Sequence, residues 1–206
     1  MPALAHLSAA HPALAGLIVR IGPCTWMPTP REPHEALIRA IAHQQLHARA
    51  AEAILNRFIA LTPGPFPPAA ATAAVQDEAL RACGFSGSKV AAIRDICART
   101  LDGTVPTSAE AAQLTDAELI ERLVTIRGVG RWTVEMVLIS TLGRPDVLPT
   151  DDFGVREGWR LITGAAAQPR PKELAEIGEA WAPYRSTAAW YLWRAADERK
   201  KVKQPA

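Results

Sequence analysis

Apolar residues recur every three or four positions along almost the whole chain, which is the spacing of one face of an α-helix. The pattern is clear at Leu37, Ile38 and Ile41, and it resumes at Ile54 after a polar interruption at residues 43–45. Such an interruption indicates two helices that meet at a bend. No stretch alternates apolar and polar residues for long enough to predict a β-strand. We therefore expect an all-α protein.

Capping residues and prolines mark where several of these helices begin and end. Thr115 and Glu118 have the spacing of a capping box, in which the two side chains satisfy backbone N–H groups at the start of a helix. Ser88 is the candidate cap of an earlier helix. The proline-rich run at residues 63–68 cannot continue a helix, so we expect a loop there.

Composition limits the class of protein without identifying it. The length of 206 residues allows a proper core, and a formal net charge of +2 permits nucleic-acid binding without requiring it. Three scattered cysteines indicate no disulfide framework, so a reducing, intracellular setting is expected. The first 21 residues contain no basic leader or long apolar run, which argues against secretion and membrane insertion. The basic tail is interpreted first as a frayed, solvated terminus, with contact to DNA phosphates as the alternative; it comprises Arg199, Lys200, Lys201 and Lys203.

The segment at residues 123–133 is the most informative part of the chain. Gly128 and Gly130 flank one aliphatic residue, and apolar residues at helical spacing follow at once. Two such glycines permit a tight turn, so the segment is predicted to be a helix-hairpin-helix. Glycine lets backbone N–H groups approach a phosphate, and the N-terminus of the next helix adds unpaired donors and partial positive charge. An ordinary helical hairpin has the same local pattern, so the neighbouring motifs must decide.

Three ordered motifs supply that context. Asp152, in the sequence TDDFG, lies 20 residues beyond Trp132. The sequence AHQQLHARAA occupies residues 42–51 upstream, and WAPYRS at residues 181–186 precedes Trp193 downstream. Over most of the chain, these motifs resemble the helix-hairpin-helix DNA glycosylase superfamily. Within it they are most similar to the compact, yeast-type form of the 3-methyladenine DNA glycosylase II (alkylbase glycosylase) subfamily.

The resemblance implies a single glycosylase domain over residues 1–206, a two-lobed helical bundle with the active-site cleft between the lobes. The central lobe is expected at about residues 35–140 and contains the hairpin at 119–142, while residues 1–34 and 145–206 form the second lobe. The implied reaction is hydrolysis of the N-glycosidic bond of an alkylated base, such as 3-methyladenine or 7-methylguanine. Base flipping would precede the reaction, and an abasic site would remain.

Departures from the family pattern narrow the expected chemistry. Trp132 occupies the position of the Schiff-base lysine of bifunctional members, so covalent lyase chemistry is not expected. No cysteine follows Cys97, which excludes the iron–sulfur branch. The residues before position 35 are expected to leave no room for the separate N-terminal β domain of the bacterial enzyme. Met136 replaces an aromatic pocket residue of that enzyme, which leaves the substrate range open.

The resemblance assigns the catalytic role to Asp152. An ionised carboxylate can stabilise an oxocarbenium-like sugar and can orient or deprotonate the attacking water. The adjacent Asp151 is expected to cap the following helix through backbone N–H groups; the alternative is that both aspartates are only caps. Trp132, Met136 and Trp193 form the expected base pocket, in which both indoles would stack on a flipped, cationic base. Without the family context, both tryptophans would be interpreted as core residues.

The expected DNA contacts lie at the bend and at the hairpin. By resemblance, Leu46 is an apolar wedge between base pairs and His47 lies in the minor groove, whereas at an ordinary helix bend these residues pack or cap. Backbone carbonyls at the hairpin are expected to hold a monovalent cation, Na⁺ or K⁺, and no other cofactor is required. The DNA-binding set is Gln45, Leu46, His47, Gly128, Gly130, Arg131 and Thr133, and the carbonyl set is Val124, Ile126 and Val129.

Two alternatives stay open on the sequence alone. A glycosylase for another purine lesion, deaminated or ring-damaged, would share the motifs. A non-catalytic helix-hairpin-helix DNA-binding protein would share the hairpin. In the favoured interpretation the chain is a monomer that acts in base excision repair on double-stranded DNA and makes no membrane contact. It is expected in the cytoplasm, at the nucleoid of a bacterium, or in the nucleus of a eukaryote.

Overall fold

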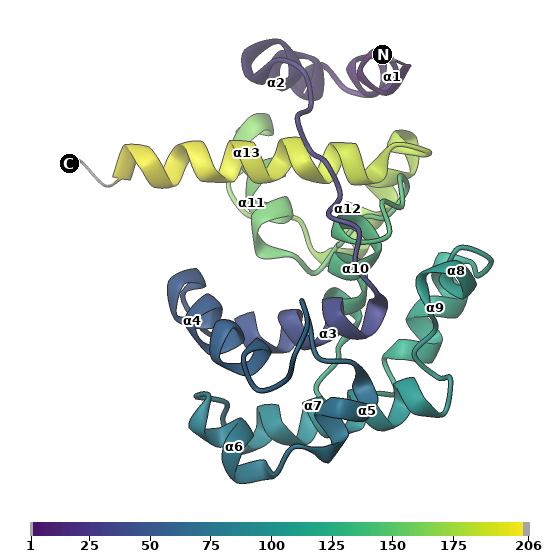
Figure 1. Cartoon of the computed structure of the whole chain (residues 1–206). Helices are drawn as coiled ribbons and strands as arrows, with labels where there is room; N and C mark the ends of the chain where they lie inside the picture. Colours follow the sequence, from purple (N-terminus) through teal and green to yellow (C-terminus); the bar gives the residue numbers. More distant parts are fainter. Residues whose placement is uncertain (1, 204–206) are drawn as a thin grey trace. The chain divides into compact units, whose positions relative to one another are not determined.

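The computed structural model describes residues 2–203, and every regular element in this part of the chain is helical (Figure 1). The prediction of an all-α protein is confirmed. Contacts between residues divide the chain into two compact units. Unit 1 joins residues 2–28 to residues 143–203, and unit 2 is the continuous segment 29–142.

The N-terminal border of unit 2 lies earlier than the lobe boundary expected from the sequence, because the first residues of the segment are bonded within this unit. The backbone N–H of Thr29 donates to the carbonyl of Ser140 at 2.8 Å. Ser108 donates through its hydroxyl to the carbonyl of Arg31 at 3.2 Å and through its backbone N–H to Glu32 Oε2 at 3.0 Å. These bonds attach the segment before the first helix of unit 2 to that unit.

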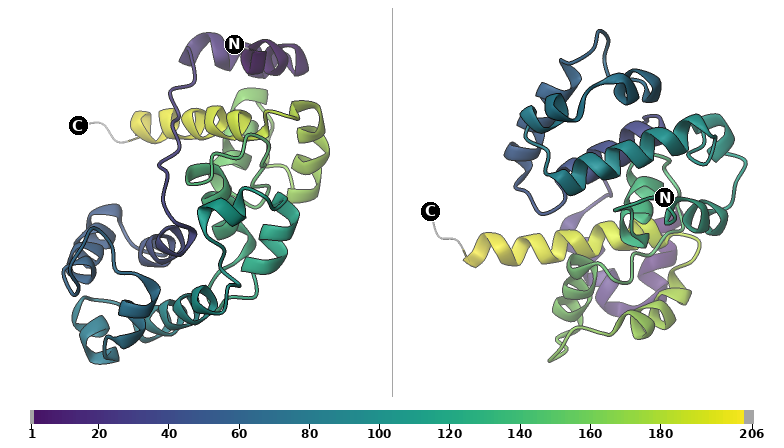
Figure 2. Two further views of the ribbon diagram at one scale, coloured as in Figure 1. Left: turned by 45° about the vertical axis from the view of Figure 1, so that its right-hand side comes forward. Right: turned by 90° about the horizontal axis from the view of Figure 1, so that it is seen from below.

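Unit 2 is built around its longest helix, α7. Its helices are α3 (Pro33–His43), α4 (Ala48–Ile59), α5 (Ala69–Ala74), α6 (Asp77–Ala82), α7 (Gly87–Leu101), α8 (Ser108–Ala111), α9 (Asp116–Leu123) and α10 (Arg131–Ser140). Helices α3, α5 and α6 pack against α7, and α3 also contacts α4 and α10 (Figure 2). Leu37 on α3 and Leu55 and Phe58 on α4 are fully buried.

Unit 1 is organised by the close packing of α11 against α13 (Figure 1). Its helices are α1 (Pro2–Ala10), α2 (Pro12–Ile21), α11 (Phe153–Thr163), α12 (Pro171–Gly178), the 3₁₀ helix η1 (Glu179–Trp181) and α13 (Arg185–Lys203). Gly158 permits this packing, since a Cβ at that position would overlap the carbonyl oxygen of Leu192. Leu14, Trp181 and Tyr191 belong to the core that surrounds the two helices.

Two of the local sequence signals are confirmed and one is wrong. The capping box of Thr115 and Glu118 is present at the start of α9, and residues 63–68 form the expected loop. The expected cap at Ser88 is wrong. Helix α7 begins at Gly87, and Ser86 is its cap, with its hydroxyl accepting the backbone N–H of Lys89 at 3.3 Å. Both serines match the cap preference, so composition alone did not separate them.

The C-terminal segment is more ordered than the expected solvated tail. Helix α13 continues to Lys203, and Arg199 Nη1 lies 2.8 Å from Glu157 Oε1 on α11. The interpretation of Arg199 as part of a frayed terminus is therefore wrong. The side chains of Lys200, Lys201 and Lys203 lie outside the residues whose side chains the structure describes. Over residues 2–203, none of the helices has the length and apolar character that crossing a bilayer requires.

Candidate functional site

The hairpin predicted around Gly128 and Gly130 joins α9 to α10. Helix α9 ends at Leu123, and Gly130 is the N-cap residue of α10. The backbone of Gly128 is left-handed, with φ of +77°, whereas Gly130 is extended, with φ of −91° and ψ of 168°. Helix α10 begins without a side-chain cap: Gly130 has no side chain to accept from the first N–H groups of the helix, and its carbonyl accepts the N–H of Val134, at 3.2 Å. Such a terminus has the donors and partial charge that bind anions.

Glycine is required by the fold at position 128 but not at position 130. A Cβ on Gly128 would lie 3.2 Å from the Cβ of Ala92, and the left-handed backbone disfavours any side chain at that position. The fold therefore requires Gly128. A Cβ on Gly130 would meet nothing within 4 Å, and its extended backbone suits any residue. Packing in unit 2 does not explain Gly130, but the close approach of a ligand to the start of α10 would explain it.

Hydrogen bonds tie the hairpin to the bend between α3 and α4. Gln44 Nε2 donates to the carbonyl of Gly128 at 3.0 Å. Lys89 Nζ donates to the carbonyls of Ala42 at 2.8 Å and Gln44 at 2.9 Å, which would otherwise be orphan acceptors at the end of α3. Burial lowers the pKa of the Lys89 ammonium. On the other side of the hairpin, the backbone N–H of Arg127 donates to an α7 carboxylate at 2.7 Å.

The bend carries the predicted wedge. Gln45 has φ of +56° and is the only residue other than glycine with positive φ in the described part of the chain. Such left-handed backbone is unfavourable for a side-chain-bearing residue and is concentrated at functional sites. Leu46, next in the chain, is 40% exposed. His47 is the N-cap of α4, where its Nδ1 accepts the backbone N–H of Arg49 at 3.4 Å. The capping role expected of a histidine at an ordinary bend is therefore present.

A pocket of about 670 Å³ lies in unit 2 between α3 and α10. Trp132 and Met136, both assigned to the base pocket by resemblance, line this pocket, and the Trp132 side chain is 45% exposed. The lining residues are Arg31, Ala36, Arg39, Ala40, His43, Gln44, Gln45, Glu52, Trp132, Thr133, Met136, Val137, Ser140 and Thr141. None of them is a lysine. The pocket therefore offers an aromatic wall and no primary amine.

The polar side chains of the pocket make two sets of contacts, one on Glu52 and one on Glu35. His43 Nε2 lies 3.0 Å from Glu52 Oε1, and Glu52 is the only carboxylate among the lining residues. Arg31 and Arg39 share the carboxylate of Glu35, at 3.4 and 2.8 Å. Sequence reasoning treated His43 only as part of a bend and did not consider Glu52. No local pattern marked these residues, because their place in the pocket depends on how α3 packs against α4 and α10.

Two other predicted DNA contacts lie on α10. Arg131 is the first residue of the helix, and its exposed side chain pairs with the buried carboxylate of Glu135 at 2.9 Å between Nε and Oε1. Thr133 is only 3% exposed and lies on the pocket wall, so its side chain does not project from the hairpin surface. The roles of both residues in DNA binding stay predictions.

The carbonyls proposed to hold a cation belong to the same hairpin. The carbonyl of Ile126 accepts the N–H of Val129 at 3.1 Å and retains a second lone pair. Val124 is the C-cap residue of α9, where a helix leaves carbonyls without intrahelical partners. Carbonyl oxygens of this kind suit Na⁺ or K⁺, so the residues fit the group and the cation stays a prediction. Among the residues placed by the structure, no cluster of three or more His, Cys, Asp or Glu side chains suits a metal ion.

Asp152 lies in unit 1, at the start of α11. Its Oδ1 accepts the backbone N–H of Val155 at 2.8 Å, so Asp152 is itself the N-cap residue of this helix. The expectation that Asp151 fills that place is wrong. Asp151 is exposed and precedes the cap, because the helix begins one residue later than that assignment requires. The same Oδ1 accepts the indole N–H of Trp193 at 2.8 Å from Nε1.

Gly154 makes room for this arrangement. A Cβ there would lie 2.9 Å from Trp193 Cδ1 and 3.1 Å from Asp152 Oδ1, both tighter than ordinary contacts. The sequence motif included Gly154, but its reason appears only when α13 is packed against α11. Trp26, which sequence reasoning left unassigned, lies beside Trp193 with 6.4 Å between ring centroids.

The segment that precedes Asp152, residues 144–147, is hydrogen-bonded to the first residues of α13. Arg185 holds Asp146 through two contacts, from Nε to Oδ1 at 2.7 Å and from Nη2 to Oδ2 at 2.8 Å. These bonds from Arg185 lower the pKa of Asp146. The Ser186 hydroxyl donates to the carbonyl of Arg144 at 2.7 Å and accepts the N–H of Val147 at 3.0 Å. The WAPYRS motif therefore has a structural role in unit 1, whatever else it does.

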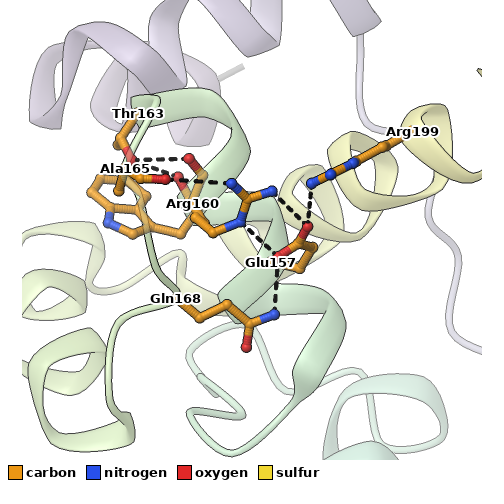
Figure 3. Close-up of polar contacts among 7 residues, drawn as sticks. Glu157, Arg160, Thr163, Ala165, Gln168 and Arg199 are labelled. Carbon is orange, nitrogen blue, oxygen red and sulfur yellow. Dashed lines mark hydrogen bonds and ion pairs between the residues drawn. The ribbon is translucent and has the colours of Figure 1, made fainter.

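The middle of α11 is anchored by a charged cluster on Glu157 (Figure 3). Arg160 Nη2 and Arg199 Nη1 each lie 2.8 Å from Glu157 Oε1, and Gln168 Nε2 donates to Oε2 at 2.9 Å. Hydrogen bonds from Arg160, followed by that from Gln168, lower the pKa of Glu157 to about 2. The cluster fixes the C-terminal part of α13 against α11.

Comparisons with known proteins agree on one family. The family model described as HhH-GPD superfamily base excision DNA repair protein matches residues 38–183. DNA-3-methyladenine glycosylase 1 of Schizosaccharomyces pombe is 45% identical over 177 residues, which cover 84% of this chain and 78% of that protein. The alkylbase DNA glycosidase-like protein mag2 of the same organism is 35% identical over 192 residues, covering 92% and 90% of the two chains.

Two solved structures are also similar over almost the whole chain. The S. pombe 3-methyladenine DNA glycosylase Mag1, in complex with abasic DNA, has a TM-score of 0.84 at 42% identity and covers 94% of this chain and 96% of its own. The DNA-3-methyladenine glycosidase of Bacillus halodurans has a TM-score of 0.89 at 34% identity, covering 98% and 92% of the two chains.

Proposed function

Because this chain belongs to the HhH-GPD superfamily of base excision DNA repair proteins, we propose that it is a monofunctional DNA glycosylase for alkylated bases. Its substrates are bases of the 3-methyladenine and 7-methylguanine type in duplex DNA, and its DNA product is an abasic site. It acts as a monomer and works where the genome lies, in the cytoplasm of a bacterium or the nucleus of a eukaryote.

The observation that carries this proposal is the half-exposed indole of Trp132 on the wall of the pocket in unit 2. Alkylation at purine N3 or N7 gives the base a positive charge, and an aromatic face attracts a cation by about 0.5–2 kcal/mol. The same charge makes the base a better leaving group, so little help from a protein acid is needed. The described residues that line the pocket include no lysine to form a Schiff base, which supports hydrolysis rather than lyase chemistry.

In this proposal, Asp152 supplies the catalytic carboxylate. As the glycosidic bond breaks, positive charge develops on the sugar, and a fixed carboxylate stabilises that charge. The carboxylate also orients or deprotonates the water that attacks the sugar. Asp152 suits this role because hydrogen bonds from Val155 and Trp193 fix its side chain.

The hairpin would hold the DNA backbone without reading sequence. The uncapped start of α10 at Gly130 offers N–H donors to a phosphate. At the bend, the exposed Leu46 would separate base pairs and His47 would enter the minor groove. A monovalent cation on the hairpin carbonyls would add positive charge near the phosphate when bound.

A panel of defined-lesion duplexes tests the proposal. The panel contains 7-methylguanine, hypoxanthine, 8-oxoguanine and undamaged DNA, with methylated genomic DNA as the source of 3-methyladenine. Released bases are measured by mass spectrometry, and strand breaks are counted before and after alkali. We expect release of the methylated bases and breaks only after alkali. Preferred release of hypoxanthine or 8-oxoguanine would identify another purine-lesion glycosylase, and breaks before alkali would contradict a monofunctional enzyme. DNA binding without any base release would identify a non-catalytic module.

A further inference from the structure

We infer that Trp193 is a positioning residue for the Asp152 carboxylate, an inference that rests on the function proposed above. The resemblance assigned Trp193 to stacking on the base. The structure directs its indole N–H at Asp152 Oδ1, 2.8 Å from Nε1. The indole nitrogen is a donor only, and its bond to an ionised carboxylate is charge-assisted and therefore strong for its kind.

Two donors from different elements converge on the same carboxylate oxygen. One is the backbone N–H of Val155, in the first turn of α11, and the other is the indole of Trp193 on α13. A cap bond alone ties the carboxylate to its own helix. The second bond ties it to a helix 41 residues away in sequence. Together they fix the orientation of the whole carboxylate, which a catalytic group requires.

The glycine after Phe153 supports this interpretation. Within a helix, glycine is about 1 kcal/mol less favourable than alanine. Gly154 lies in the first turn of α11, where a Cβ would lie 2.9 Å from Trp193 Cδ1 and 3.4 Å from Trp193 Nε1. Glycine at this position therefore clears the path between the indole and the carboxylate. A ring that only filled space would not need its Nε1 directed along this path.

Further contacts hold the Trp193 indole and helix α13 in place. Trp26 lies beside the ring of Trp193, and the Tyr191 hydroxyl donates to the carbonyl of Gly22 at 2.7 Å. At the far end of α13, Arg199 is held by Glu157 on α11 (Figure 3). The geometry of the Trp193–Asp152 bond is thus built into the packing of unit 1 before any DNA is present.

Kinetics separate positioning from stacking. Trp193→Phe keeps an aromatic face but removes the N–H. If the indole positions Asp152, the single-turnover rate of 7-methylguanine release at saturating enzyme falls about 10- to 100-fold, the range of a hydrogen bond to a charged group. Affinity for a duplex with an abasic-site analogue stays unchanged. An unchanged rate, or weaker binding with a full rate at saturation, would overturn the inference.

Nuclear magnetic resonance tests the bond without relying on activity. The indole N–H resonance of Trp193 is assigned by its loss in Trp193→Phe. Asp152→Ala removes the acceptor, and we expect the Trp193 resonance to move upfield and to exchange faster with solvent. A resonance that stays in place would contradict the bond. This readout remains decisive if the chain releases no base, a result that would reject the proposed function instead.

A pair of glycine variants provides a test that leaves Trp193 itself intact. Gly154→Ala places a methyl group against the indole and Asp152 Oδ1, so we expect the same loss of rate and the same indole shift. Gly16→Ala is the matched control, because Gly16 is also helical and a Cβ there meets nothing within 4 Å. Equal rates for the two variants would count against positioning by Trp193. Thermal unfolding of both variants shows whether unit 1 remains folded.

Discussion

The two compact units present their candidate functional groups in opposite ways. In unit 1, Asp152 accepts hydrogen bonds from a backbone N–H and from the Trp193 indole. Gly154 leaves room for the indole bond, because a Cβ there would crowd both partners. In unit 2, the groups remain accessible: Trp132 is 45% exposed, and α10 begins without a side-chain cap. Under the proposed function, the fixed groups in unit 1 would set the rate of bond cleavage, and the accessible groups in unit 2 would bind DNA and the base.

The strongest test of this division uses the two hairpin glycines. Gly130→Asp places a negative charge at the start of α10, where we propose that a phosphate binds. We expect at least about a 10-fold loss of affinity for duplex DNA, because a charged group opposes the phosphate directly. Stability should be unchanged or slightly higher, since aspartate is a good N-cap residue. Fluorescence anisotropy measures the affinity, and unchanged binding would remove Gly130 from the DNA contacts.

Gly128→Ala is the comparison variant, because we expect it to lower the free energy of unfolding and not the affinity for DNA. The left-handed backbone of Gly128 is unfavourable for alanine by about 1–2 kcal/mol, and the new Cβ would crowd Ala92. Gly130→Ala should leave the unfolding free energy unchanged. Urea denaturation of both variants makes the comparison. Equal stability of the two would mean that the glycines do not differ as described.

Trp132→Ala tests whether the exposed indole in unit 2 binds the flipped base. Removing the indole takes away its cation–π attraction and the apolar surface of the pocket wall. We expect 7-methylguanine release to slow about 10- to 30-fold, as a loss of up to about 2 kcal/mol predicts. Release should slow less for hypoxanthine, which is neutral. Single-turnover assays on the two lesions measure the difference. Unchanged kinetics on both would place Trp132 outside the base pocket.

Glu157→Gln tests whether the cluster in unit 1 contributes to its rigidity. Hydrogen bonds from Arg160 and Gln168 lower the pKa of Glu157 to about 2 in the folded chain, from an ordinary value of 4.5. Its stabilising effect is therefore complete above about pH 4.5 and is lost as the pH falls towards 2. We expect the variant to lose about 1 kcal/mol, or a few degrees in Tm, at neutral pH.

The pH dependence provides the control for that variant. The Tm difference between wild type and Glu157→Gln should shrink steadily below about pH 4.5, because Glu157 then takes up a proton in the unfolded chain while it stays ionised in the folded chain until about pH 2. A difference that stays constant down to pH 3 would mean that the charge of Glu157 does not stabilise unit 1.

The smallest expected effect concerns substrate charge in the pocket of unit 2. Glu52 is the only carboxylate on the pocket lining, and about half of its side chain is exposed, at 53%. Glu52→Gln should therefore reduce release of cationic 7-methylguanine by only about two- to threefold, because solvent screens an exposed charge. Release of neutral hypoxanthine should not change. A loss that is equal for both lesions would assign Glu52 a structural role.

Much of the fold follows from local sequence. Helical spacing predicted the all-α class, and the Thr115 capping box predicted where α9 begins. The hairpin glycines were evident because their spacing lies within one short segment. The offset between Trp132 and Asp152 pointed to the site through family resemblance, not through any physical rule about spacing.

What the sequence did not reveal depends on distant contacts. Asp152 rather than Asp151 is the cap, because the start of α11 is set by packing as well as by residue preference. The indole bond joins residues 41 positions apart, and no periodicity links them. The left-handed backbone of Gln45 could not be predicted, because glutamine, unlike glycine or asparagine, has no preference for that conformation. These features needed the packed helices.

The most direct test of the account compares wild type with Asp152→Asn on a duplex containing a single 7-methylguanine. Asparagine keeps the shape of the side chain and its capping oxygen but removes the negative charge. We predict that single-turnover base release falls by about 10²- to 10⁴-fold, while affinity for an abasic-analogue duplex is retained. Release near the wild-type rate would contradict the assignment of Asp152 as the catalytic carboxylate.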